Sequence, residues 1–183
     1  KRQFLAGSSG SIEEETQTTI MTYSRVMESP IGFLTLTASD TGLRSVHISN
    51  NFPGDHTPAR HKIVDEAVKQ LELYFWKQLE SFDLPLDFGT APLFSKSVWD
   101  LLLQIPYGKT KSYGEIARQL GGINKSRAVG LANGSNPLAI VVPCHRVIGS
   151  NGALTGYGGG LPAKEYLLML ENPARSVRQG VLF

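Results

Sequence analysis

The stretch SYGEIARQLGGINKSRAVGLA, residues 112–132, organises the second half of the chain. Ser112 and Glu115 stand three residues apart in the pattern of a capping box, which predicts that a short helix begins there. The pair Gly121-Gly122 ends that helix, and residues 125–132 predict a second one. Two short helices joined by a glycine turn in a basic segment are typical of a helix-turn-helix, although other helical hairpins share this pattern.

Further helices are predicted on both sides of this pair. Ser95 is expected to cap a helix that ends at Pro106-Tyr107-Gly108, and its apolar residues are Val98, Leu101, Leu102 and Ile105. Pro162 suits the first turn of a last helix, whose apolar residues include Leu167, Leu168 and Leu170. Residues 90–175 therefore predict a mainly helical domain, and residues 176–183 a C-terminal tail.

The first half of the chain has the period of strands. Residues 23–28, 33–37 and 43–48 alternate in polarity between turn signals, which predicts an antiparallel meander. Residues 61–79 carry apolar side chains at helical spacing, and residues 83–88 are expected to form one more strand. We therefore expect a small α/β domain over residues 21–89 and an α+β fold class for the whole chain. Residues 1–20 are expected to be an extension without function, disordered or foreign to the natural chain.

Charge is distributed unevenly between the two halves. Residues 1–89 contain 8 basic and 12 acidic residues, a net charge of −4, whereas residues 90–183 contain 10 basic and 4 acidic residues, a net charge of +6. A basic half favours a polyanionic partner, although an ordinary lysine-rich surface gives the same count. The apolar fraction of 41% supports a packed core. We expect neither a signal peptide nor a membrane span, because no apolar run is long enough.

Cys144 is the only cysteine of the sequence and lies in the run IVVPCHRVI, residues 140–148. A single cysteine cannot form an intramolecular disulfide, so a reducing, intracellular location is expected. A free cysteine is often an inert core residue. A nucleophilic thiol instead needs cationic or hydrogen-bonding neighbours to stabilise its thiolate. The adjacent His145 and Arg146 are neighbours of that kind.

His145 can serve Cys144 as a base in two ways. Adjacent side chains point to opposite sides of an extended chain, so either the backbone turns at Pro143-Cys144 or a water links the two groups. The histidine also needs a carboxylate to fix its tautomer. The candidates in this half are Asp100, Glu115, Glu165 and Glu171. Glu171 is our choice if the last helix packs against the cysteine segment.

The ordered motifs of the second half resemble those of the O6-alkylguanine-DNA alkyltransferases, also called methylated-DNA–protein-cysteine methyltransferases. The central motif is PCHRV at residues 143–147. The others are SYGEIA at 112–117, RAVG at 127–130, NGSNP at 133–137, GYGG at 156–159 and KEYLL at 164–168. They cover about residues 92–171 in the family's order. Residues 21–89 resemble the family's N-terminal, ribonuclease H-like domain only in size and strand–helix order, and the family's second domain is of a winged helix-turn-helix type.

The resemblance implies a role for each matched residue. Cys144 would accept the alkyl group from the O6 atom of guanine in one irreversible, stoichiometric turnover. His145, acting through a water and oriented by Glu171, would take the thiol proton. Asn136 would brace the backbone around the thiol, and Tyr113 would donate a proton to the leaving guanine.

The resemblance also implies how DNA is bound. The damaged nucleotide has to leave the base stack, and Arg127 would fill the vacated place. The second helix of the pair would enter the minor groove, where small side chains allow close approach. Residues expected along this contact are Ala128, Gly130, Ala132 and Ser135. The loop at Tyr157, Gly158 and Gly159 would form the wall of the base pocket.

The resemblance implies no cofactor. Some relatives hold zinc in the N-terminal domain partly through cysteines, which this chain lacks there, and His47, His56 and His61 are irregularly spaced, so no metal site is expected. The expected partner is double-stranded DNA containing O6-alkylguanine, bound by a monomer that can assemble cooperatively. The compartment would be the cytoplasm of a prokaryote or the nucleus of a eukaryote.

Two other functions fit parts of the sequence. A cysteine hydrolase would need a second histidine at the thiol and would turn over repeatedly. A non-catalytic module that binds alkylated DNA would keep the helix pair without using Cys144, and it is the stronger of these alternatives.

Overall fold

The computed structural model describes residues 21–54 and 60–174, and it begins with the expected meander. Strands β1 (Tyr23–Ser29), β2 (Gly32–Ala38) and β3 (Leu43–Ser49) form one antiparallel sheet in the order β1-β2-β3. The turn between β1 and β2 requires glycine at position 32, because its φ is +108° and a Cβ there would lie 2.6 Å from the carbonyl oxygen of Ser49. The meander is therefore confirmed. The segment 1–20 and the tail 176–183 lie outside the described residues.

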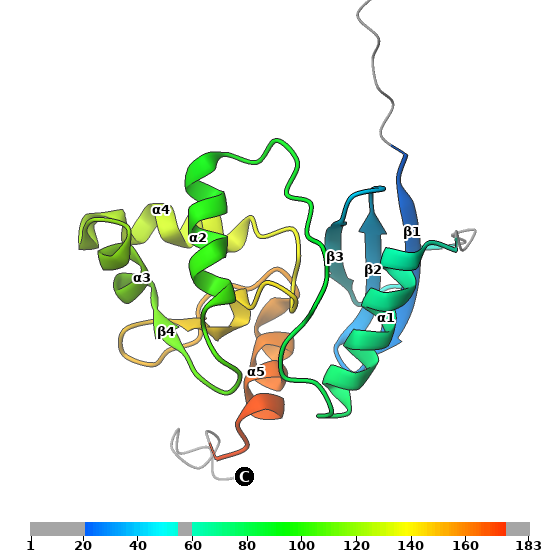
Figure 1. Cartoon of the computed structure of the whole chain (residues 1–183). Helices are drawn as coiled ribbons and strands as arrows, with labels where there is room; N and C mark the ends of the chain where they lie inside the picture. The colour runs from blue at the N-terminus through cyan, green and yellow to red at the C-terminus, as the bar shows by residue number, and fades with distance from the viewer. Residues whose placement is uncertain (1–20, 55–59, 175–183) are drawn as a thin grey trace, which may run out of the picture.

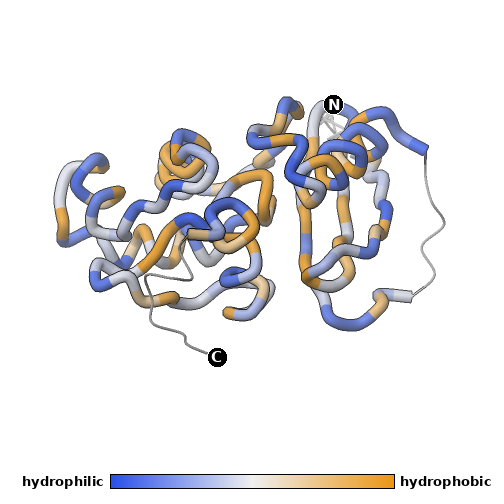
Figure 2. The backbone as a smooth tube through the Cα atoms, turned by 90° about the horizontal axis from the view of Figure 1, so that it is seen from below, coloured by the Kyte–Doolittle hydropathy of each residue, from blue (hydrophilic) through white to orange (hydrophobic). Residues whose placement is uncertain are grey.

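Helix α1 (Lys62–Phe75) packs on this sheet and buries Val64, Ala67 and Leu71. Figure 2 shows hydrophobic and hydrophilic residues alternating along the strands, as expected for a sheet with one covered face. The prediction that the helix extends to Leu79 was wrong. The chain leaves the helix after Phe75 and turns through Lys77, whose φ is +58°.

The additional strand predicted at residues 83–88 is also absent from the described structure. Only Leu86 forms a β-bridge, to Leu43. Pro85 carries no amide hydrogen and contributes its carbonyl oxygen alone, which accepts from the Leu43 amide at 2.8 Å. This segment instead crosses from the sheet to the second domain (Figure 1).

The second domain is mainly helical, and with the small sheet domain it confirms the α+β class. Its helices are α2 (Leu93–Leu103), α3 (Tyr113–Gln119), α4 (Ser126–Gly134) and α5 (Gly160–Glu171). Single 3-10 turns occur at η1 (Ile123–Lys125) and η2 (Cys144–Arg146), and the short strands β4 (Lys111–Ser112) and β5 (Val147–Ile148) pair in parallel. Helix α2 begins at Leu93 after Pro92, so Ser95 lies within it and is not its cap.

The helix-turn-helix forms as the sequence indicates. The Ser112 side chain accepts a hydrogen bond from the Glu115 amide at 3.2 Å, and the Glu115 carboxylate accepts one from the Ser112 amide at 2.7 Å. Gly121 and Gly122 make the turn with φ values of +101° and +156°, which side chains rarely allow. The capping box and the glycine turn are thus confirmed, and together they present α4 at the end of the molecule remote from the sheet (Figure 1).

The two domains are joined by backbone hydrogen bonds next to the cysteine segment. The Val46 amide of β3 donates to the carbonyl oxygen of Pro137 at 2.9 Å, and the Ala139 amide donates back to Val46 at 3.3 Å. The residues that lead to Cys144 are therefore anchored on the N-terminal sheet.

Candidate active site

Cys144 lies in the one-turn helix η2, with 5% of its surface exposed. The backbone does turn here, at Cys144–Arg146, and the thiol is not hydrogen-bonded to the imidazole, so a link through a water stays open. Asn136 supports the turn from within: its Nδ2 donates to the Val142 carbonyl at 2.8 Å, and its Oδ1 accepts from the Leu138 amide at 3.0 Å. The thiol is therefore held on a backbone segment whose polar groups are tied together by one amide side chain.

The surroundings of Cys144 act on its ionisation in opposite directions. Burial raises the pKa of the Cys144 thiol above its usual range, while a hydrogen bond from Asn136 and the charge of Lys164 favour the thiolate. The net shift of the pKa is upward. A thiol of this kind needs a base to remove its proton.

His145, the residue after Cys144, is completely buried and is the candidate for that base. Its Nε2 lies 2.7 Å from Oε1 of Glu171, and burial lowers the pKa of His145, which keeps the ring neutral. Because Glu171 is ionised, Nε2 carries the hydrogen and Nδ1 is the free basic nitrogen. Nδ1 is buried and has no hydrogen-bond partner within the described part of the chain. Nδ1 is therefore the ring nitrogen that can accept a proton.

Glu171 is the last residue of α5, and its carboxylate contacts His145. Of the four carboxylates considered, it is the one that we chose. Its Oε2 accepts from Nε of Arg146 at 2.9 Å and from the Gly108 amide at 3.1 Å. Its Oε1 accepts from Nη2 of Arg146 at 2.9 Å and from the hydroxyl of Tyr74 at 2.7 Å. Burial raises the pKa of Glu171, but the hydrogen bonds from His145 and Arg146 and the charge of Arg146 outweigh this and lower it to about 2.

Lys164 is a functional candidate that the sequence analysis missed. It is a lysine with no exposed surface, and its Nζ donates to the carbonyl oxygens of Val147 at 2.7 Å and Thr155 at 2.9 Å. These bonds tie the strand after the cysteine to the glycine-rich loop of residues 152–160. The only sequence signal was its position in the KEYLL motif at residues 164–168.

Tyr113 and Tyr157 approach the site from different elements. Tyr113 opens α3, and its hydroxyl oxygen accepts a 2.9 Å hydrogen bond from Oγ1 of Thr155. The ring of Tyr157 lies edge-on to His145 with 6.5 Å between centroids, and burial raises the pKa of its hydroxyl. The hydroxyl of Tyr157 has no partner among the described side chains and backbone groups. The glycine-rich loop thus lies beside both His145 and Tyr113.

The two loop glycines have different surroundings. A Cβ on Gly158 would meet nothing within 4 Å, whereas a Cβ on Gly159 would lie 2.8 Å from a side-chain carbon of Ile48 in β3. Gly159 is therefore needed for packing on the N-terminal domain, and Gly158 leaves open space.

Helix α4 presents Arg127 and Ala128 to solvent, and Ser135 is exposed just after it. Gly130 faces the ring of Tyr113, to which an added Cβ would make ordinary contact at 3.9 Å. The expectation that Ala132 belongs to the exposed face was wrong. Ala132 is buried, and its carbonyl oxygen accepts a 2.8 Å hydrogen bond from Nε1 of Trp99.

Leu131 takes the exposed position instead, with 71% of its surface accessible. It lies one turn from Arg127 on the same helix face. Basic side chains are also exposed around the helix pair, at Lys109, Arg118 and Lys125. This surface combines cationic side chains with an apolar one.

No cluster of three or more metal-binding side chains occurs within residues 21–54 and 60–174. His56, one of the histidines considered above, lies outside the described residues, and the ring of His61 stacks on Tyr23. None of the helices in the described part of the chain combines the length and apolar character needed to cross a bilayer.

A buried thiol, a histidine and a carboxylate beside an exposed helix-turn-helix define a class of protein: one that brings a nucleophilic cysteine to DNA. Family comparison agrees and is more specific. Residues 93–173 match the DNA-binding domain, and residues 22–88 the ribonuclease-like domain, of 6-O-methylguanine DNA methyltransferase. The chain belongs to this family.

Individual relatives match over nearly their whole length. The methylated-DNA–protein-cysteine methyltransferase of Methanosarcina acetivorans is 49% identical over 154 residues, which are 81% of this chain and 97% of that protein. The crystal structure of Mycobacterium tuberculosis O6-methylguanine methyltransferase superposes with a TM-score of 0.74 at 47% identity, covering 84% of this chain and 94% of the other. A structure of the Mycobacterium tuberculosis protein OGT in complex with DNA has the same TM-score at 48% identity, covering 82% and 92%.

Proposed function

We propose that this chain repairs O6-alkylguanine in duplex DNA by moving the alkyl group to its own Cys144. The observation that carries the proposal is the buried thiol next to a neutral histidine whose free nitrogen is Nδ1. Sγ attacks the alkyl carbon, the bond from that carbon to O6 breaks, and its electron pair leaves with guanine. The thioether that forms is stable, so each molecule acts once and needs no cofactor.

His145 is the base of this reaction. It takes the thiol proton at Nδ1, directly or through a water, while Glu171 stabilises the imidazolium that results. The 2.7 Å bond between Nε2 and Oε1 supports this role for Glu171. Asn136 holds the turn that carries Sγ, as its bonds to Leu138 and Val142 support.

Tyr113 is the acid that neutralises the leaving guanine. Its hydroxyl gives a proton to the leaving guanine. The phenolate that remains is stabilised by the hydrogen bond from Oγ1 of Thr155, which lies 2.9 Å away. The proton removed from the thiol returns to Tyr113 through solvent. Tyr157 and Gly158 form the wall of the base pocket, where the open space beside Gly158 admits the alkylated base.

Helix α4 enters the minor groove, with Arg127 in the place of the flipped nucleotide. The exposure of Arg127 and Ala128 and the cationic side chains around them support this contact. Ser135 and Gly130 lie along the same approach. We propose residues 21–89 and 90–175 as the two domains, a monomer that can assemble cooperatively on DNA, and an intracellular place of action.

Intact-protein mass spectrometry tests the proposal. The protein is mixed with excess duplex carrying O6-methylguanine, and the expected result is one added methyl group, mapped to Cys144, for each guanine restored. The Cys144→Ala variant is the control, and it is expected to bind the duplex with normal salt dependence and gain no mass.

The alternative of a non-catalytic module makes the opposite prediction. Such a module would bind the alkylated duplex and remain unmodified in both forms. Repeated turnover with unmodified Cys144 would instead indicate a hydrolase.

A further inference from the structure

Tyr74 connects the N-terminal domain directly to the site. It lies in α1, is completely buried, and donates a 2.7 Å hydrogen bond from its hydroxyl to Oε1 of Glu171. Burial and the adjacent carboxylate raise the pKa of Tyr74, so the hydroxyl keeps its proton and acts as a donor. The contact joins residues that are 97 positions apart in the sequence.

The carboxylate oxygen that Tyr74 contacts is the one that faces the histidine. Oε1 of Glu171 accepts from three side chains: Tyr74, His145 at 2.7 Å and Arg146 at 2.9 Å. Each donor draws negative charge toward itself. An oxygen shared by three donors therefore stabilises an imidazolium less strongly than one shared by two.

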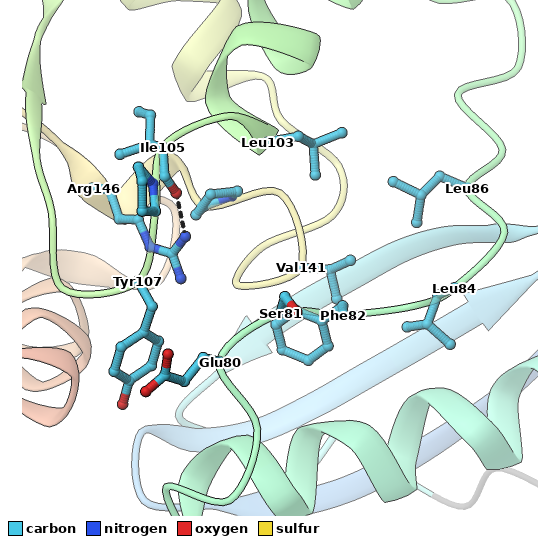
Figure 3. Close-up of a pocket in the computed structure, with 12 residues that line it drawn as sticks. Glu80, Ser81, Phe82, Leu84, Leu86, Leu103, Ile105, Tyr107, Val141 and Arg146 are labelled. Carbon is cyan, nitrogen blue, oxygen red and sulfur yellow. Dashed lines mark hydrogen bonds between the residues drawn. The ribbon is translucent and has the colours of Figure 1, made fainter.

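Packing explains the ring of Tyr74 but not its hydroxyl. The ring lies 5.5 Å from Phe75, 5.5 Å from Phe82 and 6.1 Å from Tyr107, measured between centroids. Phe82 and Tyr107 also line a cavity of about 160 Å³ together with Arg146. Figure 3 shows these side chains around it. A phenylalanine could make the same ring contacts without burying a polar group. The hydroxyl therefore points to a role at Glu171.

We propose that Tyr74 is a positioning residue for alkyl transfer, whose hydroxyl shares Oε1 of Glu171 with His145 and so keeps His145 a neutral base. This inference rests on the proposed function. It gives the N-terminal domain a part in the chemistry of Cys144 besides anchoring the segment that leads to it.

Several other titratable or charged side chains lie near the Glu171–His145 pair. They are Cys144 and Arg146 from η2, Tyr107 from the loop after α2, Tyr157 from the glycine-rich loop and Lys164 from α5. The tyrosines among them are neutral, because burial raises the pKa of their hydroxyls, so the charged side chains are the ones that bear on the ionisation of the pair. All of them are retained when Tyr74 is changed to phenylalanine, so this variant isolates the hydroxyl.

The test is the rate of a single turnover on O6-methylguanine duplex as a function of pH, compared between wild type and Tyr74→Phe. Without the Tyr74 donor, Glu171 holds the imidazolium more strongly, so His145 becomes protonated at higher pH. The acidic limb of the profile is expected to move up by about half a pH unit or more. Transfer should be about three- to tenfold slower on that limb and close to wild type above it, with the Kd for duplex unchanged.

Tyr107→Phe is the matched control. It removes a hydroxyl from the same interface, but one that donates to the backbone carbonyl of Leu170 at 3.3 Å. Its acidic limb should stay in place. An unmoved limb in Tyr74→Phe, or an equal loss of rate at every pH in both variants, would overturn the inference.

Two further measurements keep this test separate from others. NMR titration of His145 follows its protonation without any alkyl transfer, so the upward shift expected in Tyr74→Phe can be measured independently of activity. Absence of transfer by the wild type would count against the proposed function, whereas absence of the shift would count against the role of Tyr74. If Tyr74→Phe does not fold, a fluorinated tyrosine at position 74 keeps the shape and donates more strongly. The titration should then move down, and an unmoved titration would refute the role of Tyr74.

Discussion

Lys164 has the chemistry of a surface residue but no exposed surface, and both carbonyl groups that it contacts belong to the site. Its ammonium group connects Val147, just after the cysteine turn, with Thr155, the residue bonded to Tyr113. It also places a positive charge near the thiol, where it favours the thiolate. One side chain thus acts on both the shape and the charge of the site.

Replacing this residue tests both effects. Lys164→Met keeps the length of the side chain but leaves two carbonyl groups without their donor, so the free energy of unfolding should fall by about 2–4 kcal/mol. Alkyl transfer should also slow, because the thiolate loses a stabilising charge. Urea unfolding and single-turnover kinetics at neutral pH measure the two losses.

Lys69→Met is the control for this variant. Lys69 is exposed and pairs with Glu66 at 3.7 Å, so its loss should change stability by less than about 0.5 kcal/mol. Wild-type stability in Lys164→Met would show that water replaces the ammonium group at no cost.

At the scale of elements, the helix-turn-helix is built from local signals. The capping box starts α3, two glycines form the turn, and α4 buries Val129, Ala132 and Asn133 against the domain. The opposite face of α4 is left free, and it carries Arg127 and Leu131. The function proposed for Arg127 depends on this orientation.

The role of Arg127 can be separated from general attraction to DNA. Arg127→Ala should slow repair of alkylated duplex by at least about tenfold, yet leave the reaction with free O6-benzylguanine near wild type, because only the duplex requires flipping. Single-turnover rates on both substrates provide the comparison.

Arg118→Ala is the matched control, since Arg118 is an exposed arginine in the last turn of α3. It should weaken DNA binding and reduce its salt dependence, and its repair rate at saturating duplex should match wild type. Equal losses on the two substrates for Arg127→Ala would exclude the stack-filling role.

At the scale of the whole molecule, the buried Glu171 network links stability to pH. Folding lowers the pKa of Glu171 from 4.5 to about 2, so the unfolded chain binds more protons than the folded one below pH 4.5. Folding also lowers the pKa of His145 from 6.5, so the unfolded chain binds more protons at this residue than the folded one below pH 6.5. Stability from both groups is therefore present at neutral pH and is lost as the pH falls from 6.5 toward 2.

The expected result is a steep loss of unfolding free energy on acidification, of which Glu171 contributes about 3 kcal/mol. Urea unfolding at a series of pH values measures it. Glu171→Gln should be less stable at pH 7, and its free energy of unfolding should depend less on pH. Glu72→Gln, at an exposed site on α1, should follow wild type. Parallel pH profiles for wild type and Glu171→Gln would contradict the assignment.

Alkylation should also affect the stability of the whole molecule. Cys144 is nearly buried, and an added group has to be accommodated next to the turn held by Asn136. We expect a lower Tm after reaction, and a larger decrease for a benzyl than for a methyl group. The free energy of unfolding should fall by about 1–3 kcal/mol. Calorimetry before and after reaction with O6-benzylguanine measures the change, and Cys144→Ala should show none. An unchanged or raised Tm would mean that the pocket is already shaped for the product.

Much of this protein could be predicted from its sequence because the signals are local. Alternating polarity defined the meander, a serine and a glutamate three residues apart defined the start of α3, and paired glycines defined the turn. The errors occurred where local signals end: α1 stops before Leu79, α2 begins before Ser95, and residues 83–88 make one bridge instead of a strand. Tertiary contacts compete with propensity at such places.

The sequence by itself determined the order of the sheet and helical parts, the helix-turn-helix and the position of the single cysteine next to a histidine, because these depend on residues close together in the chain. Only the tertiary structure decided which carboxylate meets His145, that Lys164 is buried, that Ala132 faces the core, and that Tyr74 reaches Glu171 from the other domain. These contacts join residues far apart in the chain. A helical pattern indicates that one face is buried, but only the packing of the elements determines what that face contacts.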